Sequence, residues 1–189
     1  MKKIILFFVV FLFIPTCCLA NEKKEVKLKS CVDGDTANFI LNKRKIKVRF
    51  LAIDSPEIKH GNKKAEPYGN AAKNFTCNKL KKAKIIEIEY DKNSDKKDKY
   101  GRYLAWVFTD GKLLQKEIVK NGYAKVKYLY DDYKYTDVLL KAQKSANANK
   151  KGIHSDEEYD EEEIIFEKIL SMIKRILNDI INFFKKLLK

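Results

Sequence analysis

Residues 45–57 read KIKVRFLAIDSPE, and their pattern indicates a β-strand with one buried face. Three apolar side chains, Ile46, Val48 and Phe50, alternate with basic ones, which is the period-2 spacing of a half-buried strand. The strand is expected to continue as far as Ile53, because the Ser-Pro pair that follows cannot extend a central pairing ladder.

Four further segments have the composition of short strands, and three segments have the apolar spacing of helices. The strands are expected at 26–32, 36–41, 84–90 and 103–108. The helices are expected at 68–82, 113–120 and 136–150. Because strands and helices do not alternate regularly, this order argues against a Rossmann-type sheet. It favours an α+β fold, a small β-barrel with attached helices.

The first twenty residues have the pattern of a secretory signal peptide and are not expected to belong to the fold. Two lysines precede eleven apolar residues (4–14), a run too short to span a bilayer, which needs about 20. We expect cleavage after Ala20 and a secreted or cell-surface protein. A lipid anchor on Cys17 or Cys18 and a retained N-terminal anchor are the alternatives.

The chain is strongly basic, with 40 Lys and Arg against 26 Asp and Glu and a net charge of +14. The excess belongs to the central part, since residues 22–155 carry 32 Lys and Arg against 17 Asp and Glu. A positive field of this size favours polyanionic partners, either nucleic acid or an anionic membrane face. A lysine-rich but merely solvated surface is the alternative.

Two cysteines, Cys31 and Cys77, remain in the chain that cleavage would leave. They either form a disulfide in an oxidising compartment or stay as two buried thiols, and both readings fit the sequence. Neither has a nearby His or a second Cys at zinc spacing, which argues against a metal–thiolate site.

The composition changes sharply after the predicted domain, 21–155. Seven of the eight residues in 156–163 are acidic, which predicts a linker. The segment from Ile164 to Lys189 then predicts an amphipathic helix whose broad apolar face needs a partner. We expect this helix to lie on an anionic membrane surface, with self-association or docking on the domain as alternatives. No obligate protein partner is expected.

Four short motifs hold the residues that could carry chemistry. They are DGDT at 33–36, Arg49 followed by IDSPE at 53–57, KYGR at 99–102 and YLY at 128–130. Each is weak alone, because Asp-Gly and Tyr-Gly are common turn pairs. Together, in this order and at this spacing, they resemble the staphylococcal nuclease (thermonuclease) family, whose signature runs D-G-D-T, then R-x4-D-[TS]-P-E, then K-Y-G-R. The resemblance covers about residues 26–155.

The resemblance implies a five-stranded OB-fold barrel with about three helices. It also implies Ca²⁺ as the cofactor, bound by the carboxylates of Asp35 and Asp54 and by the backbone carbonyl of Ser55. Asp33 is expected to lie next to these ligands without binding the ion itself. The set agrees with the chemistry of calcium, which takes oxygen ligands in flexible geometry.

The catalytic roles that the resemblance implies fall on Glu57, Arg49 and Arg102. Glu57 is expected to act as the general base, or to orient the attacking water. The two arginines are expected to grip the scissile phosphate, since a guanidinium offers a planar fork of donors that fits phosphate oxygens and remains charged. Both would stabilise the negative charge that develops in the transition state.

Substrate binding is implied for five other residues. Lys99 and Tyr100 are expected to hold the neighbouring phosphate, and Tyr128 and Tyr130 to flank the base. Lys63 is expected to add positive charge from a loop that covers the substrate. Because stacking on aromatic rings tolerates any base, both DNA and RNA are expected as substrates, and the family's products carry a 3′-phosphate.

These observations favour a secreted, Ca²⁺-dependent nuclease. A barrel of the same fold that holds nucleic acid without cutting it is the alternative, and a membrane-associated interaction protein led by its C-terminal helix is the third class. The enzyme is favoured because all five residues that catalysis would need are present. They are Asp35, Arg49, Asp54, Glu57 and Arg102.

Overall fold

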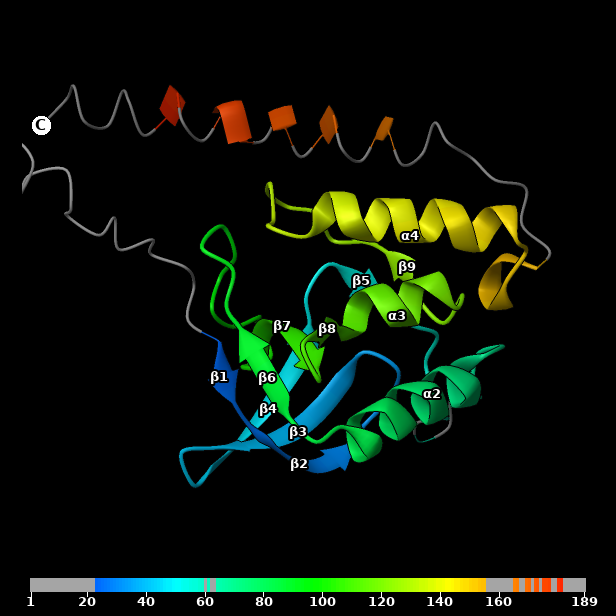
Figure 1. Ribbon diagram of the computed structural model, residues 1–189. Coiled ribbons are helices and arrows are strands. Elements are labelled where there is room, and N and C mark those ends of the chain that lie inside the picture. The colour runs from blue at the N-terminus through cyan, green and yellow to red at the C-terminus, as the bar shows by residue number, and fades with distance from the viewer. Residues whose placement is uncertain are drawn as a thin grey trace, which may run out of the picture.

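Strand β4 (Arg44–Phe50) lies in the middle of the main sheet in the computed structural model of this chain (Figure 1). The structure describes residues 23–59, 61, 64–155, 165–166, 169–170, 172–173, 175–177 and 180–181. β4 pairs antiparallel with β3 (Thr36–Leu41) and in parallel with β7 (Tyr103–Thr109). The buried face predicted for residues 45–53 is confirmed, because Ile46, Val48 and Phe50 are all buried.

The other strands extend the sheet on both sides of β4. The sheet runs in the order β1-β6-β7-β4-β3-β2, and β8 pairs with β7. These strands are β1 (Lys24–Glu25), β2 (Lys27–Cys31), β6 (Ile86–Glu89) and β8 (Lys112–Leu113). A separate antiparallel pair joins β5 (Ile53–Asp54) to β9 (Lys125–Val126). Since only Val26 separates β1 from β2, both ends of the sheet order lie on one continuous stretch of chain.

The described residues form nine strands where the sequence predicts five. The predicted strand at 45–53 is divided because Ala52 has a φ of 61°, a left-handed conformation that turns the chain between β4 and β5. The parallel pairing of β4 with β7 is a second difference. Alternation identifies the buried face of a strand but not the strand beside it. The α+β class is confirmed.

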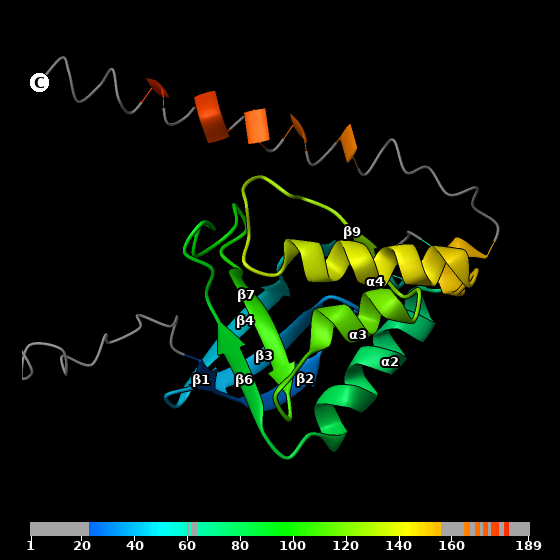
Figure 2. The same cartoon turned by 45° about the horizontal axis from the view of Figure 1, so that its top comes forward.

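Three α-helices cover one side of the strands in both views (Figures 1 and 2). They are α2 (Gly69–Lys82), α3 (Leu114–Lys120) and α4 (Thr136–Ala148), and a short 3-10 helix, η1 (Gly152–His154), follows. All three predicted helices are thus confirmed, with ends shifted by one or two residues. Three lysines in the last turn of α2 face the negative end of its helix dipole, which stabilises that terminus.

Close backbone packing holds η1, at the end of the domain, against the turn that follows α3. The amide of Ile153 donates a hydrogen bond of 2.9 Å to the carbonyl of Gly122. A side chain on either Gly122 or Gly152 would overlap the backbone of the other segment, and both residues have positive φ. Glycine is therefore required at both positions.

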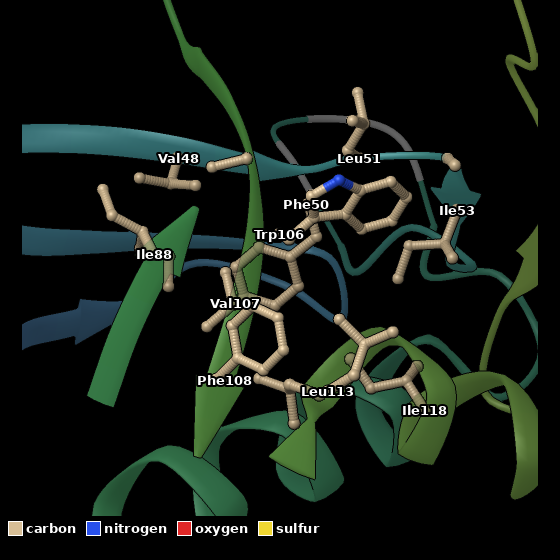
Figure 3. Close-up of a cluster of buried hydrophobic side chains, with 14 of the residues drawn as sticks. Val48, Phe50, Leu51, Ile53, Ile88, Trp106, Val107, Phe108, Leu113 and Ile118 are labelled. Atoms are coloured by element: carbon tan, nitrogen blue, oxygen red, sulfur yellow. The ribbon is translucent and has the colours of Figure 1, made fainter. Parts of the chain in front are cut away.

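The core lies between the sheet and the helices. Figure 3 shows Phe50 of β4 and Trp106 of β7 packed near Ile118 of α3. Trp106 is the single tryptophan of the chain and is fully buried, and its Nε1 donates to Oδ2 of Asp91 at 2.8 Å. Burying each large apolar side chain of this kind stabilises the fold by about 1.5–3 kcal/mol.

Cys31 at the end of β2 and Cys77 within α2 form a disulfide, with their Cα atoms 5.7 Å apart. The structure therefore selects the first of the two states that the sequence allowed. The bond closes a loop with a sequence separation of 46 residues and ties α2 to the sheet.

Replacing both cysteines, Cys31→Ala with Cys77→Ala, is expected to lower the free energy of unfolding by about 4 kcal/mol, because the unfolded chain regains the entropy of the open loop. Guanidinium chloride unfolding followed by the fluorescence of Trp106 measures the change. Dithiothreitol added to the unaltered protein is the control and should produce a similar loss. An unchanged midpoint in both experiments would contradict a stabilising disulfide.

Candidate active site

The Asp-Gly-Asp-Thr motif forms the turn that leads into β3. Within it, the amide of Asp35 donates to Oδ1 of Asp33 at 3.0 Å, so Asp33 fixes the shape of the turn. Gly34 is buried, and a Cβ there would lie 2.7 Å from Oγ of Ser55. Because glycine has no side chain, the turn can pack closely against the Ser55 segment that follows β5.

The carboxylate of Asp35 is buried, with 5% of the residue exposed, and it accepts several hydrogen bonds. Its Oδ2 accepts from the amide of Ser55 at 2.7 Å, and its Oδ1 accepts from Oγ1 of Thr36 at 3.0 Å. Nε of Arg49 lies 3.1 Å from the same Oδ1. Burial raises the pKa of Asp35 to about 6, although the positive charge of Arg49 acts in the opposite direction.

The guanidinium of Arg49 lies between two carboxylates. In addition to its contact with Asp35, its Nη2 donates to Oδ1 of Asp54 at 3.0 Å. Its Nη1 donates to the carbonyls of Phe50 and Ile53, at 2.9 and 2.6 Å. Arg49 is therefore 9% exposed, unlike the solvent-facing charge that is usual in a strand. The turn between β4 and β5 wraps around this side chain.

Glu57 lies beyond β5 in an exposed position beside this cluster. Its backbone forms two hydrogen bonds with Glu66: its amide donates to Oε2 at 3.0 Å, and its carbonyl accepts from the Glu66 amide at 2.9 Å. Burial raises the pKa of the Glu57 carboxyl, and the charges of Asp35, Glu66 and Asp54 raise it further, whereas Arg49 lowers it. A raised pKa suits a group that must accept a proton near neutral pH.

Arg102 is held by Asp98 at the start of β7. Its Nε lies 2.6 Å from Oδ2 of Asp98, and Oδ1 of Asp98 accepts from the amides of Tyr100 and Arg102. Burial acts to raise the pKa of Asp98, but the hydrogen bonds and charge of Arg102 outweigh it and lower that pKa. The register pairs Arg49 with Leu104, so Arg102 comes two residues before the partner of Arg49. β7 begins at Tyr103, the register partner of Val48, so the backbone places Arg102 beside the strand that carries Arg49.

The KYGR loop presents its other two predicted site residues to solvent. Tyr100 is one of the most exposed aromatic side chains in the described part of the chain, at 72%. The Nζ of Lys99 lies 5.1 Å from the centre of its ring, and the guanidinium carbon of Arg102 lies 5.5 Å from it. This loop therefore presents two cations around one exposed ring.

Comparison with protein-family models matches residues 47–156 to the family described as staphylococcal nuclease homologue. The match covers more than half of the chain and includes both arginines, Asp54 and Glu57. The chain belongs to this family. The resemblance drawn from the four motifs is thus confirmed.

Several curated relatives match most of the chain. Endonuclease YncB of Bacillus subtilis (strain 168) is 39% identical over 142 residues, which cover 74% of this chain and 66% of the relative. The SPbeta prophage-derived endonuclease YokF of the same strain is 39% identical over 140 residues, covering 74% and 47%. Thermonuclease of Staphylococcus hyicus is 35% identical over 137 residues, covering 72% and 79%. The chain thus spans just under two thirds and about half of the length of the two B. subtilis relatives.

In this staphylococcal nuclease homologue, two exposed tyrosines border the cluster. The rings of Tyr128 and Tyr130 lie 6.1 Å apart, and the guanidinium carbon of Arg49 lies 5.8 Å from the centre of the Tyr128 ring. The structure therefore brings Tyr128 next to Arg49 and places Tyr130 beside Tyr128. Lys63, the last predicted substrate contact, lies outside the described residues.

Sequence reasoning missed Lys127, which precedes Tyr128. Its Nζ lies 3.4 Å from Oδ2 of Asp54, so Asp54 contacts cations on both of its oxygens. The antiparallel pairing of β5 with β9 brings the two residues together across 73 positions of sequence. Only the pairing of these two short strands could have revealed the contact, and no motif signals it.

A second missed cluster holds the loop that carries the tyrosines. Glu89 is fully buried in β6, and its carboxylate accepts from Nζ of Lys134 at 2.6 Å and from the hydroxyl of Tyr135 at 2.9 Å. The carboxylate of Asp91 accepts from the amide of Lys134 at 2.8 Å. Two buried acids thus fasten the end of the 128–135 segment to the sheet, which limits the positions available to its rings.

The donors around Asp35 fit a calcium ion. Asp35 and Asp54 could supply carboxylate oxygens. Ser55, whose amide donates to Asp35, could supply its backbone carbonyl. All of these are hard oxygen ligands of the kind that Ca²⁺ takes. Arg49 contacts both carboxylates, so the same oxygens already attract a cation. Within the part of the chain that the structure describes, no group of three or more His, Cys, Asp or Glu side chains could hold a metal ion.

Proposed function

We propose that this protein is a Ca²⁺-dependent nuclease that hydrolyses the phosphodiester bonds of DNA and RNA and leaves 3′-phosphate ends. The observation that carries the proposal is the Arg49 guanidinium, which lies between the carboxylates of Asp35 and Asp54 beside a glutamate of raised pKa. Relatives named endonuclease and thermonuclease support the same reaction class.

Glu57 is the general base in this proposal. Its carboxylate accepts a proton from the water that attacks the phosphorus, or orients that water by a hydrogen bond. Burial and the acids that surround Glu57 favour its protonated form, and so they strengthen it as a base relative to an isolated glutamate. The backbone hydrogen bonds with Glu66 hold it in place during the step.

Arg49 and Arg102 bind the phosphate in this proposal. Each guanidinium donates to the non-bridging oxygens, where negative charge accumulates in the pentacoordinate transition state. Arg49 exchanges its bond to Asp54 for one to the phosphate, and Arg102 does the same with its bond to Asp98. Asp35, Asp54 and the carbonyl of Ser55 hold Ca²⁺, which when bound supplies electrostatic activation of the phosphate.

The aromatic and basic residues at the border of the site bind the rest of the substrate. Tyr128 and Tyr130 flank a base, an arrangement worth about 1–3 kcal/mol per stacked base. Lys99 and Tyr100 hold the neighbouring phosphate, and Lys63 adds charge. Stacking makes no distinction between ribose and deoxyribose, which supports activity on both nucleic acids.

We also propose that the domain closes as a five-stranded barrel and acts outside the cell. Closure is supported by β1 and β2, which flank Val26 and pair with β6 and β3 respectively. Export after removal of residues 1–20 is supported by the disulfide of the domain, since such bonds persist in oxidising compartments. The mass of the secreted chain tests this cleavage. It should correspond to a chain that begins at Asn21.

Digestion of plasmid DNA and single-stranded RNA by the purified chain is the direct test of the nuclease. Both substrates should be cut in buffer with CaCl₂, and cutting should stop when EGTA removes the ion. The DNA fragments should resist extension by terminal transferase until a phosphatase removes the 3′-phosphate. A folded sample with CaCl₂ that retards DNA in a gel without cutting it would contradict the enzyme and favour the binding barrel.

A further inference from the structure

The described residues between 165 and 181 are helical and expose a dense set of large apolar side chains. Nine of these side chains are 46–63% exposed. They are Ile165, Phe166, Ile169, Met172, Ile173, Ile176, Leu177, Ile180 and Ile181. The described surface of the domain does not cover them, and so large an apolar area is unfavourable in water. The nuclease site makes no use of this segment.

The sequence from Ile164 to Lys189 separates polar from apolar positions when it is wound at 100° per residue. After Ile164, every polar residue falls within a single arc. The arc holds Glu167, Lys168, Ser171, Lys174, Arg175, Asn178, Asp179, Asn182, Lys185, Lys186 and Lys189. Six of these residues are basic and two are acidic, so the polar face is positively charged. The opposite arc holds only Ile, Leu, Met and Phe.

Among the described residues, an ion pair between this segment and the domain involves the polar arc. Nη1 of Arg175 lies 3.1 Å from Oδ2 of Asp132, in the loop that precedes α4. Figures 1 and 2 show the coloured helical pieces running past α4 at the outside of the molecule. A helix held through its polar side leaves its apolar side available to another partner. Docking of the apolar face on the barrel, one of the alternatives raised by the sequence, therefore lacks support among the described residues.

We propose that this helix binds an anionic lipid bilayer, lying flat with its apolar face in the acyl chains. When the sequence is wound in this way, lysines fall at both borders of the apolar arc, Lys174 and Lys185 on one side and Lys168 and Lys186 on the other. At these borders a long side chain reaches the headgroups while its stem stays on apolar surface. Each such cation near an anionic surface adds to the attraction.

A second copy of the chain is a poorer occupant of the same face. In this winding the borders also hold Glu167 and Asp179, but lysines outnumber them, so packing two such helices together would leave an excess of like charge along the contact, which opposes association. No helix among the described residues is long and apolar enough to cross a membrane. The in-plane orientation therefore fits the charge pattern best.

Sedimentation of the full secreted chain with lipid vesicles tests the proposal. Vesicles of phosphatidylglycerol and phosphatidylcholine in equal parts should carry the protein into the pellet, and vesicles of phosphatidylcholine alone should carry much less. The double variant Ile173→Glu with Ile180→Glu places two charges at the centre of the apolar face. It should lower the partition coefficient by about tenfold or more.

The matched control is Ser171→Glu with Asn178→Glu, which adds the same charge to the polar arc. It should keep most of the binding and become more sensitive to salt. Equal losses in the two variants would show that binding depends on net charge and not on the apolar face, and would overturn the proposal. So would an oligomer in analytical ultracentrifugation that becomes a monomer only in Ile173→Glu with Ile180→Glu. Trp106 fluorescence during unfolding verifies that each variant keeps a folded domain.

Discussion

Glu57→Gln should lower kcat for DNA by about 10²–10⁴-fold, the range that a positioned general base contributes. Glutamine keeps the size of the side chain and its hydrogen-bonding oxygen, but it cannot accept the proton from water. The side chain of Glu57 is exposed and its local structure is held by backbone hydrogen bonds with Glu66, so the domain should remain folded. Initial rates on a fluorescent single-stranded substrate, with DNA affinity from gel retardation, separate the loss of turnover from binding.

Glu66→Gln is the matched control for this experiment. It removes the same charge from a neighbouring glutamate and keeps the oxygen that accepts from the Glu57 amide. Its rate should stay within about threefold of the parent, since a single surface charge contributes little to the energy of the site. If the two variants lose activity equally, the effect comes from the charge of the loop, and Glu57 is not the base.

Arg49→Lys should reduce stability and activity together, because the guanidinium stabilises the fold and, in the proposed reaction, also binds the phosphate. Its fork donates to two backbone carbonyls and contacts Asp35 and Asp54. A lysine ammonium is a point charge and cannot satisfy these acceptors simultaneously. We expect the free energy of unfolding to fall by about 2–4 kcal/mol. The value of kcat should fall by about 10²–10³-fold, through poorer stabilisation of charge on the phosphate.

Arg102→Lys separates these two effects. Arg102 is partly exposed and its ion pair is with Asp98 in the same loop, so its replacement should cost less than about 1 kcal/mol of stability. The loss of kcat should be similar to that of Arg49→Lys, because both arginines bind the same phosphate in the proposed reaction. Denaturant unfolding and initial rates, measured on both variants, give the comparison. Equal losses of stability would contradict the structural role assigned to Arg49.

The sequence predicts the elements of this fold better than it predicts their pairing. The alternation through Ile46, Val48 and Phe50 identifies β4 and its buried face, and the helical spacings give α2, α3 and α4. The parallel pairing of β4 with β7 needs information that periodicity does not contain. The same limit left open the disulfide between Cys31 and Cys77, since the approach of two distant segments decides it.

For the candidate site as well, the sequence predicts the local motifs but not the contacts between distant segments. The motifs identify Asp35, Arg49 and Asp54, and the structure brings these residues into contact. The burial of Arg49 was not predictable from its strand, because it depends on the carbonyls that the turn at Ala52 directs inward. Lys127 was missed because the β5–β9 pairing brings it to Asp54 from a distant segment with no motif of its own.

The close backbone packing of Gly122 against Gly152 affects which parts of the sequence can vary during evolution. All residues of the proposed cleavage site precede Gly152, and the helix that we expect on the lipid follows it. A chain shortened after Ser155 keeps this closure, whereas one shortened before Gly152 loses it. Segments beyond Ser155 can therefore be gained, exchanged or lost without any change in the packing of the domain. The location at which the protein acts can then evolve separately from its proposed substrate.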